Sequence, residues 1–151
     1  MDWKIELVPV PVADVDKAKA FYVDQVGFHA DHDHQVHEEL RFVQLTPPGS
    51  ACSIVIGTGT TDMAPGTQRI QIVVADADEA KAHLERNGVD TRGVDEEPWG
   101  RFVYFNDPDG NEWSLQQMLP QGDDNDPARA ELADAMRSID ASGEDGTAGV
   151  G

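Results

Sequence analysis

The chain has 151 residues, and its 29 acidic side chains outnumber its 11 basic ones, so the formal net charge is −18. This charge argues against nucleic-acid and membrane partners, because both are bound through clustered lysine and arginine. The single cysteine, Cys52, excludes an intrachain disulfide and lies in an apolar run, as a small core residue would. The start of the chain has no basic region followed by an apolar stretch, and no apolar run approaches the roughly 20 residues that span a bilayer, so we expect a cytoplasmic protein. The charge is compatible with a cationic or neutral small-molecule ligand.

The first half of the chain predicts one strand, one helix and three further strands. Residues 4–12 have the apolar and β-branched content of a strand. Asp14 is a suitable N-cap for the helix that follows, and Gly27 ends this helix. Three short runs of β-type sequence come next, at about 28–36, 40–46 and 51–57.

The second half of the chain predicts the same order of elements. Residues 68–74 have strand character, Asp76 is the next helix N-cap, and the Asn-Gly pair at 87–88 ends that helix. Three predicted strands follow, at about 89–94, 101–106 and 112–118. The chain is therefore predicted to contain an internal repeat.

Two sequence matches make the repeat explicit. Residues 12–14 (VAD) recur at 74–76 with an offset of 62, and residues 46–49 (TPPG) correspond to 107–110 (DPDG) with an offset of 61. The repeat predicts two βαβββ modules and an α+β fold. Because a single module has too few residues to cover its own sheet, we expect the two modules to share a larger curved sheet.

The domain boundaries follow from this repeat and from a change in composition. Module one spans about 4–57 and module two about 68–118, within a domain over 1–119. The remaining residues, 120–151, are acidic and poor in large apolar side chains, which predicts a largely flexible tail. A short helix is predicted within this tail at 127–139, where Pro at the first helical position and a thin apolar stripe are typical of a helix.

Four motifs carry a resemblance to a known family. They are residues 12–22, Gly27-Phe28, residues 99–102 (WGRF) and residues 107–113 (DPDGNEW). Together with the doubled module, they resemble the vicinal oxygen chelate superfamily, the glyoxalase, bleomycin-resistance and extradiol-dioxygenase group. The resemblance covers about 4–118. It implies two modules forming a cup-shaped mixed β-sheet barrel, and it implies a homodimer.

Metal-dependent members of that superfamily hold a divalent ion from four strand positions that point into the cup. The resemblance carries these positions onto Leu7, Ser53, Arg69 and Ser114 of this chain. None of these side chains is a histidine, carboxylate or thiolate, the groups that zinc, iron and manganese require. We therefore expect no metal and no other cofactor, which argues against the metal chemistry of the superfamily.

The same inward positions supply candidate ligand-binding residues. Arg69 could bind a carboxylate or phosphate through two hydrogen bonds, or pair internally with an acid. Trp99 is a candidate aromatic wall at the mouth of the cup, where it would stack on a flat or cationic ligand. The predicted ligand-binding set is Leu7, Arg41, Ser53, Arg69, Trp99, Phe102 and Ser114.

Two further groups of residues have competing interpretations. Four histidines lie in one stretch, HADHDHQVH at 29–37, which fits a metal site or a pH-sensitive patch but better fits an exposed, charged edge strand. For catalysis the chain offers Ser53, Ser114 and Cys52, without an evident partner histidine. Glu112 is the one carboxylate that shares the predicted face of Ser114.

These observations lead to two principal functions. The first is a metal-independent small-molecule-binding protein that sequesters a cationic or aromatic compound, as bleomycin-resistance proteins do. The alternative is an enzyme of the same fold that acts on a small organic substrate, with Arg69, the serines and Glu112 as its polar groups. A metal enzyme that uses the histidine stretch is a third interpretation.

Overall fold

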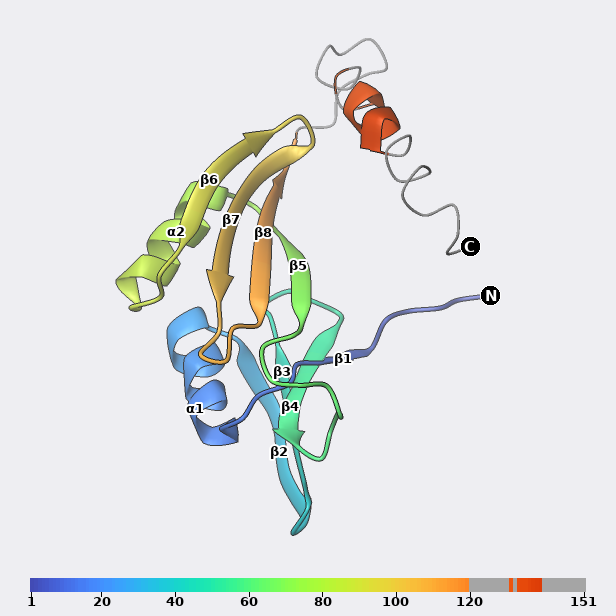
Figure 1. The fold of residues 1–151 in the computed structure, drawn as a ribbon, viewed down its shortest axis with the longest axis vertical. Coiled ribbons are helices and arrows are strands. Elements are labelled where there is room, and N and C mark those ends of the chain that lie inside the picture. Colours follow the sequence, from blue (N-terminus) through green and yellow to red (C-terminus); the bar gives the residue numbers. More distant parts are fainter. Residues whose placement is uncertain (120–130, 132, 140–151) are drawn as a thin grey trace.

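The computed structural model describes residues 1–119, 131 and 133–139. It confirms the α+β fold of two βαβββ modules (Figure 1). The predicted tail, 120–151, lies largely outside the described residues. Its described residues, 131 and 133–139, are helical, within the helix predicted at 127–139. No helix within the described part of the chain is long and apolar enough to cross a membrane.

The first module is a four-stranded mixed sheet with a helical segment packed against it. Its strands are β1 (Leu7–Pro9), β2 (His29–His37), β3 (Leu40–Thr46) and β4 (Ser53–Thr58). They are arranged in the order β1-β4-β3-β2, with β1 parallel to β4 and the other neighbours antiparallel. The helical segment is α1 (Val15–Ala20), which continues as the π-helical turns η1 (Phe21–Val26).

The second module repeats this topology in the order β5-β8-β7-β6. Its strands are β5 (Arg69–Val74), β6 (Arg92–Glu97), β7 (Gly100–Asn106) and β8 (Glu112–Met118), and its helix is α2 (Ala77–Arg86). The strand ladders of the described residues pair strands only within a module. The two sheets therefore form an open cup and do not close into a barrel.

The local signals in the sequence work as expected at both helix starts. The Asp14 carboxylate accepts the Lys17 N–H at 3.0 Å, and the Asp76 carboxylate accepts the Glu79 N–H at 3.1 Å. Gly27 follows η1 with φ of 103°, which favours glycine. The strand predicted over 4–12 is shorter, Leu7–Pro9, and the prolines at 9 and 11, which lack the N–H that a ladder needs, limit its C-terminal end.

One apolar core lies on the helical side of both sheets. The register assigns Val103 and Phe105 to this side, and Phe102 and Tyr104 to the opposite face. Trp113 is 1% exposed, which confirms its predicted place in the helix-packed core. The rings of Phe21 and Tyr22 from η1 pack on Phe105 and Trp113, so the core runs across both modules.

A buried polar network joins the modules at the turn between β7 and β8. The Asp107 carboxylate accepts the Tyr22 hydroxyl at 2.7 Å and the Asn111 side-chain N–H at 2.7 Å. The Trp113 indole N–H donates to the Tyr22 oxygen at 2.9 Å. Burial, reinforced by the Asp107 carboxylate, raises the pKa of Tyr22, so its hydroxyl remains a donor. Asn111 also donates to the Pro11 carbonyl at 2.8 Å, which ties this turn to the first module.

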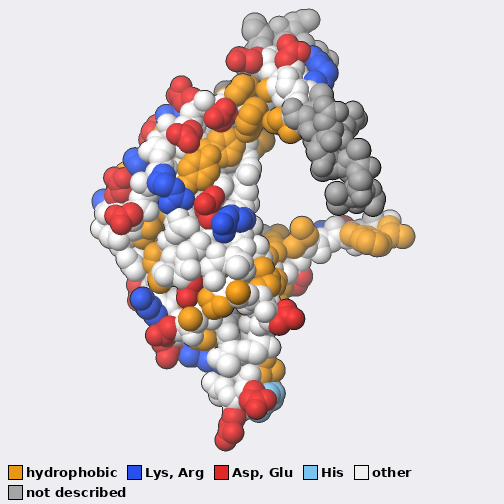
Figure 2. Space-filling view, viewed as in Figure 1, with side chains coloured by type: hydrophobic (Ala, Val, Ile, Leu, Met, Phe, Trp, Pro, Cys, Tyr) orange, Lys and Arg blue, Asp and Glu red, His pale blue; other side chains and the backbone are white. Residues whose placement is uncertain are grey.

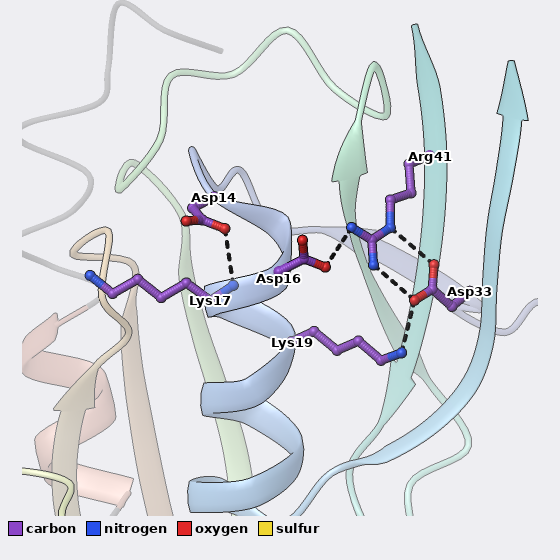
Figure 3. A network of polar contacts seen from close by, with 6 residues as sticks. All are labelled: Asp14, Asp16, Lys17, Lys19, Asp33 and Arg41. Carbon is purple, nitrogen blue, oxygen red and sulfur yellow. Dashed lines mark hydrogen bonds and ion pairs between the residues drawn. The ribbon is translucent and has the colours of Figure 1, made fainter. Parts of the chain in front are cut away.

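Each module also ties its helix to its sheet through an arginine. In the first module, Arg41 donates to Asp16 of α1 at 2.8 Å and to both carboxylate oxygens of Asp33 at 3.0 and 2.9 Å (Figure 3). In the second module, Arg101 binds Asp78 of α2 at 2.7 Å. These matching pairs hold α1 and α2 on the same side of the molecule (Figure 1).

Candidate functional site

A cleft of about 760 Å³ lies between the two modules. One side is formed by β1, the start of β4 and the turn at 47–50. The other side is formed by β5, by Ala80, His83 and Leu84 of α2, and by core side chains that include Phe105 and Trp113. Most lining side chains are apolar, and its volume falls in the range that holds small organic ligands. The cleft is therefore the principal candidate site.

A few polar side chains lie among the apolar ones. Ser53, which is 5% exposed, lies 2.6 Å from the Thr46 hydroxyl and accepts the Gln44 amide N–H at 3.3 Å. Gln71 on β5 donates to the Gln116 side-chain oxygen at 2.5 Å. The His83 ring nitrogen Nε2 lies 2.8 Å from the Val26 carbonyl, to which only an N–H can donate. Such sparse polar groups in an apolar cleft can orient a ligand.

The second sheet adds a second surface next to this cleft, on which Phe102 is only 5% exposed and Gln116 only 8%. We call it the open face, meaning the side of β5, β8 and β7 opposite the helices. Gln71, Ser114 and Tyr104 form one row across it, and Val73, Gln116 and Phe102 form the next. The Phe102 and Tyr104 rings stack with centroids 6.2 Å apart. Figure 2 shows hydrophobic side chains along the second sheet, flanked by basic and acidic groups.

The predicted ligand-binding residues fall into three places. Ser53 lines the cleft, and Leu7 is its neighbour in the β1–β4 ladder. Arg69, Phe102 and Ser114 lie on the open face, where Glu112 is confirmed on the face of Ser114.

Two of these residues lie elsewhere. The backbone carbonyl of Trp99 accepts the Gln116 amide N–H at 3.0 Å, and Trp99 is outside the cleft lining. Arg41 is held by Asp16 and Asp33 on the helical side, away from the cleft (Figure 3). The fold therefore gives Arg41 a structural ion pair.

The residues present do not suit the metal that the superfamily chemistry needs. Leu7, Ser53, Arg69 and Ser114 supply no imidazole, carboxylate or thiolate. Among the described residues, no three histidine, cysteine or acidic side chains gather in a way that could hold an ion. The histidine stretch is the exposed edge strand β2, where the rings of His32 and His34 stack at 5.8 Å. The four side chains at these positions are therefore unsuited to holding a catalytic divalent ion.

The sequence reasoning missed the residues of α2 and β5 that line the cleft, among them Leu84, His83 and Gln71. A signal for them was present in the repeat. With the offset of 62, Leu84 corresponds to Tyr22, and with the offset of 61, Cys52 corresponds to Trp113. Smaller side chains at matched core positions indicate unfilled space.

Comparisons with known proteins agree with this architecture. The family model described as the Glyoxalase/Bleomycin resistance protein/Dioxygenase superfamily matches residues 4–115. The Bacillus subtilis protein YetH is 31% identical over 119 residues, which cover 76% of this chain and 98% of that protein.

Two solved structures come from Streptomyces sp. CB03234. TnmS3, described as an antibiotic binding protein, is 38% identical with a TM-score of 0.72, covering 78% of this chain and 98% of its own. A glyoxalase/bleomycin resistance protein is 39% identical with a TM-score of 0.68, covering 76% of this chain and 100% of its own.

Proposed function

Because the chain belongs to the Glyoxalase/Bleomycin resistance protein/Dioxygenase superfamily, we propose that it is a metal-independent protein of the cytoplasm that binds and sequesters a cationic or aromatic small molecule. The observation that carries this proposal is the apolar cleft of about 760 Å³ between the modules. A structural relative described as an antibiotic binding protein, at 38% identity, supports the same class of function.

The ligand would occupy the cleft and extend onto the open face. Ser53 and Leu7 lie at the β1–β4 side of this path. Tyr104, which is half-buried and stacks on the buried ring of Phe102, offers an aromatic face for a flat ligand. Arg69 and Ser114 add polar contacts on the same face. The formal charge of −18 favours a cationic ligand, because the field of the whole protein concentrates cations near its surface.

The proposal includes a homodimer. β1 and β5 are outer strands of their sheets. Trp3 and Ile5 are 83% and 72% exposed on an N-terminal segment that projects from the body (Figure 1). Apolar side chains beside open strand edges favour contact with a second copy. Sedimentation should show a dimer that weakens when Trp3→Ser and Ile5→Ser are combined, whereas a monomeric parent protein would contradict this part.

Calorimetric titration with proflavine, a planar cation, and with 2-naphthol, a neutral aromatic, tests the binding function. We expect binding of at least one compound and its recovery unchanged by mass spectrometry. Cys52→Trp places an indole in the cleft and should weaken that binding at least about tenfold, since the ligand and the indole would compete for one volume.

The matched control is Val36→Trp, which adds the same indole to the exposed edge strand β2. This variant should bind like the parent protein. Conversion of the compound to a product would favour the enzyme alternative. Absence of binding by the parent protein, or equal binding by Cys52→Trp, would contradict the proposal.

A further inference from the structure

A chain of polar side chains meets the cleft at Ser53, and its hydrogen bonds run in one direction. Four side chains lie in sequence, from Gln44 through Ser53 and Thr46 to Asp31. They come from β3, β4 and β2, on the side of the first sheet opposite α1. An ionised carboxylate can only accept hydrogen bonds, so the Thr46 hydroxyl must donate to Asp31.

This first assignment fixes the next one. The single proton of the Thr46 hydroxyl is used on Asp31, so Thr46 can only accept from Ser53. The Ser53 hydroxyl therefore donates to Thr46 across 2.6 Å. Ser53 also accepts the Gln44 amide N–H at 3.3 Å. Its proton and one of its two lone pairs are thus committed inside the protein, and one lone pair is left.

We propose that Ser53 is a specificity-determining residue that selects ligands carrying a hydrogen-bond donor, such as a phenolic hydroxyl or an N–H group. The inference rests on the proposed binding function and narrows its ligand class. A donor group on the ligand can form a hydrogen bond to the remaining lone pair of the Ser53 hydroxyl oxygen. An acceptor-only group placed there meets a lone pair and leaves both oxygens without a partner, which is costly in an apolar cleft.

A second chain of amides supports the same polarity on the β5 side of the cleft. The Trp99 carbonyl can only accept, so Gln116 presents its N–H to Trp99 and its oxygen to Gln71. Gln71 therefore donates one side-chain N–H to Gln116, and its side-chain carbonyl oxygen can accept a hydrogen bond from a ligand. Gln71 retains a second N–H, so Ser53 is the more selective of the two residues.

The test compares 2-naphthol with 2-methoxynaphthalene, which differ in one donor. Transfer of the additional methyl group from water favours the ether. A donor-selective site reverses this order, and we expect the parent protein to bind 2-naphthol about 3–10-fold more tightly, as one hydrogen bond allows. Fluorescence titration measures both affinities.

Two variants separate recognition by Ser53 from a structural role. Ser53→Ala should lower the affinity for 2-naphthol to that for the ether, without weakening ether binding. Thr46→Val removes the acceptor that holds the Ser53 proton, so the hydroxyl can turn and donate, and ether binding should rise. Thermal unfolding confirms that each variant is folded. A purely structural role of these residues would change both affinities in parallel.

The outcomes distinguish this inference from the function on which it rests. Equal binding of the two probes by the parent protein, or tighter binding of the ether, overturns donor selection and leaves the binding function standing. Persistence of the preference in Ser53→Ala also overturns it. Failure of the parent protein to bind proflavine and both naphthalene probes overturns the binding function itself, and the inference with it.

Discussion

The repeat creates two equivalent contacts between the modules, and they differ in how they are filled. In the first contact, Tyr22 of η1 meets Trp113 and Asp107 of the second module through a closed network of hydrogen bonds. Asp109 of the same turn accepts the Ala13 N–H at 3.1 Å, directly before α1. Large side chains and satisfied polar groups fill this contact, and Trp113 also forms part of the cleft wall.

The second contact has the same backbone plan with smaller side chains. Leu84 takes the place of Tyr22, and Cys52 takes the place of Trp113. Pro48 takes the place of Asp109 and offers no carboxylate to Ala75, the counterpart of Ala13. The four residues of this second contact all line the cleft: Pro48, Cys52, Ala75 and Leu84. The cleft is therefore the unfilled counterpart of a packed contact.

The two contacts of the duplicated module therefore have different roles. The packed contact stabilises the association of the two modules, because burial of aromatic side chains is its main contribution. With that association secured, the equivalent contact can remain hollow without loss of the fold. Stability thus comes mainly from the packed contact, and the binding space lies in the hollow contact, which Trp113 also borders.

The largest expected effect separates the two halves directly. Trp113→Ala removes a fully buried indole and should cost about 3–5 kcal/mol of the free energy of unfolding. The equivalent change in the hollow half, Cys52→Ala, should cost about 1 kcal/mol or less, because few contacts are lost. Urea unfolding measures both values, and similar losses in the two variants would contradict the division.

A smaller effect is expected from the hydroxyl at the centre of the packed contact. Tyr22→Phe takes a donor from Asp107 and leaves the Trp113 indole N–H without its acceptor. Because both groups are buried, we expect a loss of about 1–3 kcal/mol in the free energy of unfolding. Tyr104→Phe on the open face is the control, expected within about 0.5 kcal/mol. Equal losses would show that the network adds no stability.

The smallest effect compares the arginine pairs of the two modules. Hydrogen bonds from Arg41 and Lys19 hold the pKa of Asp33 well below its ordinary range. The unfolded chain therefore binds this proton more readily than the folded protein. The resulting stability is present above about pH 4, the ordinary aspartate value, and is lost as the pH falls toward the lower folded value.

Asp33→Asn should consequently flatten the acid limb of a plot of unfolding free energy against pH. We expect a change of about 1 kcal/mol or less, because the pair is partly exposed. The matched control is Glu96→Gln in the second module, because Glu96 pairs with Arg101 as Asp33 pairs with Arg41. The Glu96 side chain is 77% exposed, whereas that of Asp33 is only 27% exposed, so the control should change the acid limb less. A steeper acid limb in Asp33→Asn would contradict the assignment.

Much of the fold could be predicted because its signals are local. Asp14, Asp76 and Gly27 act within one or two turns of their own helices, and strand alternation placed Glu112 beside Ser114. The candidate site was predicted less well. Ser53 lines the cleft, whereas Arg41 forms an ion pair between helix and sheet. This ion pair was not predicted, because the acidic partners of Arg41 on α1 and β2 could not be identified from spacing alone.

The sequence by itself determined that the chain is a doubled βαβββ module, because periodicity, caps and turns are encoded by neighbouring residues. Tertiary structure alone decided which contact between the modules is packed and which is hollow. That outcome depends on pairs such as Tyr22 and Trp113, which lie 91 residues apart and meet only in the folded core. The volume left between side chains is a property of those distant pairings, so it becomes visible only after folding.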